Sequence, residues 1–165
     1  MNSCARNTWA ICKRELNGYF VSPVAYVFII IFLVMCGFFP WMVGQFFERN
    51  EASLVRYFDW HPWLYLFLVP AIGMRLWAEE RRNGSMELLM TMPVTHWQAI
   101  LGKYLAAWLV IAMALLLTFP TILTVFFLGK PDGGVMACGY LGSFLVAGAY
   151  LAVSCATSAM TRNQV

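Results

Sequence analysis

The sequence contains few charged residues. Only 12% of its 165 residues are charged and 61% are hydrophobic, whereas about a quarter of the residues of a soluble domain are charged. Charge is absent from the runs 16–47, 104–129 and 133–161. Each run is longer than the roughly 20 residues with which a helix crosses a bilayer. The scarcity of charge therefore excludes an ordinary soluble domain and indicates a membrane protein.

Several motifs of metal, redox and nucleotide chemistry are also missing. The five cysteines form no C-x-x-C pair, and His61 and His96 lie far apart without acidic residues deep in the apolar runs. There is no G-x-x-x-x-G-K-[ST] loop to hold phosphates. These absences weigh against a metal-dependent or redox membrane enzyme. They predict no cofactor on this chain, and the net charge of +3 is too small to indicate nucleic acid.

The fold class expected is all-α, a polytopic helical membrane protein in which 1–165 form one transmembrane domain. Helices are expected because every backbone polar group must be satisfied within the spanning segment. The second span is short, and it can cross if its flanking cationic side chains reach the interface. The predicted spans are 23–44, 60–77, 104–127 and 136–158.

The distribution of Lys and Arg predicts which way the chain sits. Cytoplasmic segments are enriched in these residues. Eight fall in the N-terminal segment, in 75–103 and in the C-terminal tail, and three fall on the other side. The N-terminus and 78–103 are therefore expected in the cytoplasm. The outer segment 46–60 is expected to be a connection anchored at the interface by Tyr57, Phe58 and Trp60.

Residues 8–20 have the pattern of a helix lying in the membrane interface. Lys13, Arg14 and Asn17 occupy one face, and Gly18 and Pro23 offer a break before the first span. The apolar residues that recur on the other face at helical spacing are Trp9, Cys12, Leu16, Tyr19 and Phe20.

The fourth span contains small residues at every fourth position. Such faces allow helix backbones to approach closely in lipid. We expect packing within the molecule or at a dimer seam, and the alternative is the lining of a substrate path. The two ladders are Gly139, Ser143 and Ala147, and Gly148, Ala152 and Ala156.

The polar segment 78–103 is predicted to form a helix, a break, a short helix, a second break and a third helix. Asn83 and Gly84 stop the first helix, and Ser85 caps the short one, with Glu87 favourably placed in its first turn. Pro93 ends that short helix. Thr95 and Gln98 then form a T-x-x-Q capping box that starts the third span. The short helix has apolar side chains rimmed by charge, which is typical of a partner site.

The same segment carries a family resemblance. It resembles the permease subunits of type-two ABC exporters, and most of all the gliding-motility and copper-enzyme-maturation group. The S-P-x-A-Y motif at 22–26 and the C-terminal "SAMTRNQV" are also similar to that group. The motif residues in the polar segment are Glu79, Glu80, Arg81, Arg82, Gly84, Ser85, Glu87, Leu88, Leu89, Pro93, Val94, Leu101, Gly102 and Lys103.

The resemblance implies a permease subunit in a bacterial inner membrane. Such a subunit pairs with a second permease, identical or different, and with a separate ATPase chain that binds ATP and magnesium. Family members have six spans, so this chain with four is expected to be truncated at its C-terminal end. The residues expected to couple to the ATPase are Glu79, Glu80, Arg81, Arg82, Gly84, Ser85, Met86, Glu87, Leu88, Leu89, Met90 and Pro93.

One other class of function stays open from the residues. A non-transporting membrane scaffold or assembly subunit would have the same spans. The polar segment, with its apolar short helix, weighs against that class. Nothing in the apolar spans indicates the chemistry of a cargo, because hydroxyl side chains there usually bond to their own helix.

Overall fold

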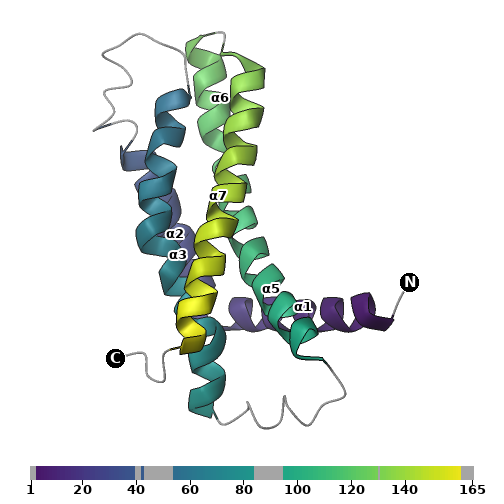
Figure 1. Ribbon diagram of the computed structural model, residues 1–165. Coiled ribbons are helices and arrows are strands. Elements are labelled where there is room, and N and C mark those ends of the chain that lie inside the picture. The colour runs from purple at the N-terminus through teal and green to yellow at the C-terminus, as the bar shows by residue number, and fades with distance from the viewer. Residues whose placement is uncertain (1–2, 40–41, 43–53, 84–94, 130, 161–165) are drawn as a thin grey trace.

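The computed structural model describes residues 3–39, 42, 54–83, 95–129 and 131–160. Every regular element within these ranges is a helix, which confirms the predicted fold class. The elements are α1 (Ser3–Val21), α2 (Pro23–Phe38), α3 (Val55–Asn83), α5 (His96–Leu116), α6 (Phe119–Leu128) and α7 (Gly133–Met160) (Figure 1).

The helices form an elongated bundle with one helix lying across its end. Helices α2, α3, α6 and α7 run along the bundle, and α5 leads obliquely into α6 (Figure 1). Helix α1 lies across the end at which α3 and α7 finish and α5 begins, which we call the proximal end. The distal end holds the connection from α6 to α7. Helix α1 and the end of α7 thus lie at the same end of the bundle. This is the arrangement expected of a chain that crosses the bilayer an even number of times.

Two stretches are each long and apolar enough to cross a membrane. They are Trp97–Leu128, which contains α5 and α6, and Gly133–Met160. Helices α1 and α2 meet the same criterion only when taken together as a bent pair. The chain is therefore an integral membrane protein, and the residues that the structure describes contain two or three candidate spans. The assignment of four spans, with α2 and α3 each crossing, stays a prediction.

The bend between α1 and α2 follows from Ser22 and Pro23. The chain direction changes by 74° between Arg6–Val21 and Ala25–Phe38. Ser22 is extended, with φ −87° and ψ 146°, because a residue before proline is pushed out of the helical region. Pro23 then occupies the first turn of α2, where its missing N–H costs nothing. The expected break thus becomes a corner one residue long.

The predicted third span, 104–127, contains a break between α5 and α6. Pro120 removes a backbone donor and its ring clashes with the carbonyl four residues earlier, so the helix cannot continue unchanged. The hydroxyl of Thr118 donates to the carbonyl of Leu115 at 2.6 Å. This side chain satisfies an acceptor at the end of α5. The third span is therefore two helical pieces, which the apolar pattern alone did not indicate.

The most extensive contact between helices joins α3 to α7. A Cβ added at Gly73 would lie 2.3 Å from the Cβ of Ser154, and one added at Gly139 would lie 2.3 Å from the ring of Phe58. Nearer the proximal end, the hydroxyl of Ser158 on α7 donates to the carbonyl of Met74 on α3 at 3.0 Å. Small residues thus bring the two helices close along most of their length, as dispersion-driven packing in lipid requires.

We expect Gly73→Ala to destabilise the protein. The new methyl group overlaps Ser154 on α7, and overpacking of this kind costs about 1–3 kcal/mol. The measurement is the midpoint of thermal unfolding of the purified protein in detergent.

Gly142→Ala is the matched control for that substitution. Gly142 also lies in a helix, and a Cβ there meets nothing within 4 Å. Alanine at an open helical position is neutral or stabilising by up to about 1 kcal/mol. Equal unfolding midpoints for the two variants would contradict the close α3–α7 contact.

Candidate functional site

The predicted coupling segment is bracketed by two described helices. Helix α3 continues through 79–82 to Asn83, the last described residue before the gap at 84–94, so the stop predicted at Asn83 and Gly84 stays a prediction. Gly84, Ser85, Met86, Glu87, Leu88, Leu89, Met90 and Pro93 lie outside the described residues, so the short helix stays a prediction. The description of Glu79, Glu80, Arg81 and Arg82 extends to their helical backbone only.

The start of α5 forms as predicted. Thr95 is the N-cap, with extended backbone angles, and the capping box with Gln98 is present. The backbone N–H of Thr95 donates to Oε1 of Gln98 at 3.3 Å. This reciprocal bond satisfies a donor that the first turn of a helix otherwise leaves open. The beginning of α5 is thereby fixed at the proximal end.

Helix α1 packs on the first turns of α5 at Gly102. A Cβ at Gly102 would lie 2.8 Å from Cγ2 of Ile11 and 3.1 Å from the carbonyl oxygen of Thr8. Glycine is therefore required for the two backbones to come this close. The buried face of α1 is centred on Ile11 and Cys12, whereas Trp9, predicted on the apolar face, is 63% exposed.

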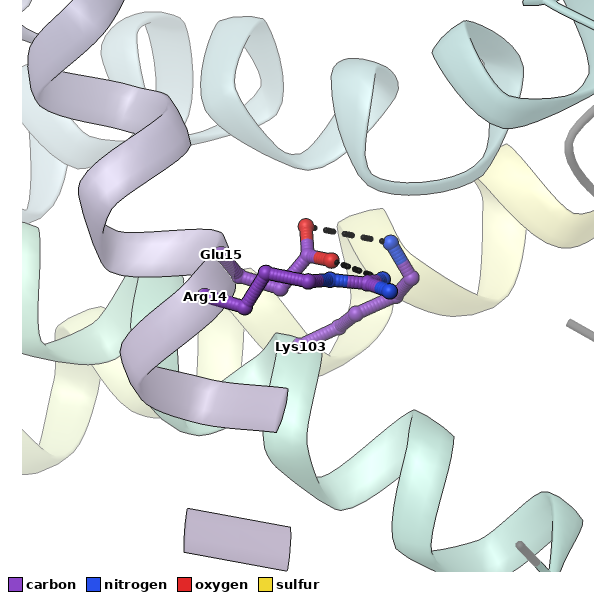
Figure 2. Close-up of polar contacts among 3 residues, drawn as sticks. All are labelled: Arg14, Glu15 and Lys103. Carbon is purple, nitrogen blue, oxygen red and sulfur yellow. Dashed lines mark hydrogen bonds and ion pairs between the residues drawn. The ribbon is translucent and has the colours of Figure 1, made fainter. Parts of the chain in front are cut away.

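An ion pair fixes α1 to α5 beside this contact. Nζ of Lys103 on α5 lies 3.2 Å from Oε2 of Glu15 on α1, and NH2 of Arg14 lies 2.7 Å from Oε1. Figure 2 shows the carboxylate held between the two cationic groups. The side chain of Lys103 is only 2% exposed and that of Glu15 is 20% exposed. Helix α1 is thus attached to the helix that follows the predicted coupling segment.

The charge balance at Glu15 favours the ionised carboxylate. Burial by itself raises the pKa of Glu15, but the charges and hydrogen bonds of Lys103 and Arg14 outweigh burial and hold that pKa below its usual value. The carboxylate is therefore negative near neutral pH. A buried ammonium that faces a negative carboxylate is compensated, which is the condition under which charges persist inside proteins.

A second polar cluster lies between α3 and α7 in the distal half of the bundle. Oγ of Ser143 is 2.6 Å from the hydroxyl of Tyr65 and 2.9 Å from Nδ1 of His61. The hydroxyl of Tyr140 is 2.9 Å from Oγ1 of Thr118. His61 is 1% exposed, so its side chain lies inside the bundle.

One predicted interfacial anchor is also a core residue. Tyr57 is 1% exposed, and its ring packs edge-on against His61 with centroids 4.6 Å apart. The expectation that Tyr57 anchors an outer loop in headgroups is therefore wrong. Helix α3 begins at Val55, two residues before Tyr57, and this early start turns the side chain into the bundle.

The two ladders of small residues on α7 face different helices. Gly139, Ser143 and Ala147 lie toward α3, where Gly139 contacts Phe58 and Ser143 contacts Tyr65. Gly148 faces α5, because a Cβ there would lie 3.1 Å from the indole of Trp108. Ala152 and Ala156 are exposed and line an apolar groove of about 410 Å³ with Leu101 and Tyr104.

Sequence reasoning missed the partner of Lys103. Glu15 is the acidic residue within the predicted interfacial helix, and Lys103 is the last charge before a long apolar run. A lone acid on a basic helix and a lone base at the start of a span are the signal that could have paired them. Within the described ranges, no group of three His, Cys, Asp or Glu residues could hold a metal ion.

Comparison with known proteins gives one match. A family model described as "ABC-2 family transporter protein" matches residues 64–165, which is more than half of the chain and includes most of α3 and all of α5, α6 and α7. No curated protein and no solved structure matches the chain.

We expect the two halves of the ion pair to respond differently to substitution. Glu15→Gln takes the carboxylate away from an ammonium that is 2% exposed, which costs about 1–3 kcal/mol. Lys103→Met keeps the buried stem and leaves Glu15 beside Arg14, so its cost is below about 1 kcal/mol. Thermal unfolding in detergent measures both. A larger loss for Lys103→Met would show that the buried charge is not what needs compensation.

The stabilisation from Glu15 has a defined pH dependence. Because its native pKa lies below the usual value of 4.5, the native state binds this proton less tightly than the unfolded chain does. The contribution is complete above about pH 4.5 and is lost as the pH falls through the native pKa. We expect the difference in unfolding midpoint between wild type and Glu15→Gln to be constant from about pH 7 to about pH 5.5 and to shrink below about pH 4.5. A difference that grows on acidification would contradict the assigned direction.

Proposed function

Because this chain belongs to the ABC-2 family of transporter proteins, we propose that it is the membrane permease of an ATP-driven exporter and couples to a separate ATPase chain through 78–103. The family makes it a membrane component of an ABC transporter and not itself an enzyme. Export as the direction, and the coupling segment as the contact, are the proposal.

The meeting of helices at the proximal end is the observation that supports this proposal. Helix α3 ends there at Asn83, α5 begins there at His96, and α1 lies across the same end (Figure 1). The polar segment therefore connects the end of α3 to the start of α5, the helix on which α1 packs. A partner that binds this segment acts on α3 and α5 directly.

The ion pair extends that action to α1. A displacement of the start of α5 would be passed to α1 through Lys103 and Glu15 and through the close contact at Gly102. Helix α1 continues after one residue into α2. Movement imposed at the coupling segment would in this way reach α1, α2, α3 and α5.

The remaining features of the proposal follow from this role. A second permease subunit, identical or different, completes the pathway, and the ATPase chain holds ATP and magnesium. Closure of the ATPases on ATP rocks the helices between inward-open and outward-open states. The proximal end, with the N-terminus, faces the cytoplasm of a bacterial inner membrane, since most of the Lys and Arg residues fall on that side.

We expect substitutions in the coupling segment to weaken ATPase binding. Glu87→Lys reverses a charge that would set orientation, and Leu88→Asp puts a carboxylate into the apolar contact. Either change lowers recovery of the ATPase in a detergent pull-down by roughly tenfold or more, given about 1.4 kcal/mol for each factor of ten. The permease is co-expressed with a candidate ABC ATPase.

Asn17→Lys is the matched control for Glu87→Lys. Asn17 is exposed on α1 and lies at the same end of the bundle, so this lysine alters charge on the same side at a position outside the segment. Its ATPase recovery stays at the wild-type level. Undiminished recovery with both segment variants, or no ATPase bound by the wild type, would overturn the coupling assignment.

A further inference from the structure

The distal half of the bundle contains two buried polar atoms that make no hydrogen bond with any residue the structure describes. They are Nε2 of His61 and the hydroxyl oxygen of Tyr57. Both side chains are 1% exposed. An ionisable or polar group inside a membrane bundle is expensive unless it has a partner, and it therefore indicates a site.

The two side chains lie on one inward face of α3. Tyr57, His61 and Tyr65 are four residues apart, so they are stacked along the same side of the helix. The ring centroids of Tyr57 and His61 are 4.6 Å apart, so the two side chains are in direct edge-to-face contact. Phe32 and Phe58 close the site, with centroids 6.0 and 5.3 Å from the imidazole.

The contacts on the other side of the imidazole allow the tautomer that makes Nε2 a donor. The hydroxyl of Tyr65 lies 2.6 Å from Oγ of Ser143, and that Oγ lies 2.9 Å from Nδ1 of His61. When Tyr65 donates to Ser143 and Ser143 donates to Nδ1, a neutral imidazole carries its proton on Nε2. We adopt this direction of the hydrogen-bond chain.

We propose that the Nε2–H group of His61 and the hydroxyl of Tyr57 together bind one water molecule inside the bundle. The N–H group donates to the water oxygen, and the phenol accepts from the water or donates to it. The site suits an uncharged oxygen, because its walls are aromatic and hold no carboxylate or ammonium among the described side chains. Buried waters typically make about three hydrogen bonds to groups that the protein leaves open.

The surroundings of Tyr57 supply a third partner for the water. Cys36 of α2, Thr118 and Tyr140 of α7 lie beside the Tyr57 hydroxyl. Thr118 is the residue at which α5 and α6 separate. The water site therefore lies where the third span is interrupted and where α2, α3 and α7 also meet. Interrupted helices in transporters characteristically border polar sites.

The chain contains two histidines, so the site can be observed directly. We would label histidine with ¹⁵N in a His96→Gln variant, purify the complete protein, return it to lipid bilayers and record solid-state NMR spectra of the His61 ring. The expected result is a neutral ring protonated at Nε2, with a cross-peak from that proton to water. A ring protonated at Nδ1, or an Nε2 proton without a water cross-peak, would overturn the proposal.

Thermal unfolding of Tyr57→Phe gives an independent readout. If the hydroxyl binds water, its removal lowers the unfolding midpoint by about 2–4 °C, the effect of one hydrogen bond in a chain of this size. If the hydroxyl has no ligand, phenylalanine relieves an unsatisfied group and the midpoint is unchanged or higher. That second outcome would also overturn the proposal, whatever becomes of the ATPase coupling.

Tyr65→Phe is the matched control for that substitution. The same hydroxyl is removed from the next tyrosine along the same face of α3, and its bond to Ser143 is present in the structure. Its midpoint falls by a similar amount under either outcome. This control shows that the assay resolves the loss of one buried hydrogen bond.

Discussion

The close contact between α3 and α7 is the interaction on which the rest of the bundle depends. In lipid no hydrophobic effect drives helices together, so association relies on packing and on hydrogen bonds between helices. Gly73, Gly139 and Ser154 remove the bulk that would hold the two helices apart. The short distance then brings Ser143 within reach of Tyr65 and His61.

At the proximal end, the contact between helices depends on a charge pair as well as on a small residue. Gly102 allows α1 to approach α5, and the pair of Lys103 with Glu15 determines which side of α1 faces inward. A contact made only of apolar side chains would tolerate rotation of the helix. A buried ammonium tolerates little, because any rotation that moves the carboxylate away leaves its charge uncompensated.

Local patterns in the sequence were predictive, and contacts between distant segments were not. The capping box of Thr95 with Gln98 and the break at Pro23 depend on neighbouring residues, so both could be foreseen. The apolar periodicity of 8–20 predicted a helix with Trp9 and Cys12 on one apolar face, but it could not tell that Cys12 is buried in the protein whereas Trp9 is 63% exposed. The real face is set by where α5 lies, and the sequence of α1 does not contain that information.

The one-residue corner at Ser22 makes the first two helices part of a closed mechanical loop. Helix α1 is bonded to α5, continues through the corner into α2, and α2 packs against α3 and α5. Because these helices are joined in a closed loop, none of them can tilt without moving the others. A small rotation of α1 about the corner would displace the far end of α2 by a larger distance. The stiffness of the corner therefore determines how far α2 moves when α1 rotates. A substitution that straightened the corner would join α1 and α2 into one helix and remove this coupling.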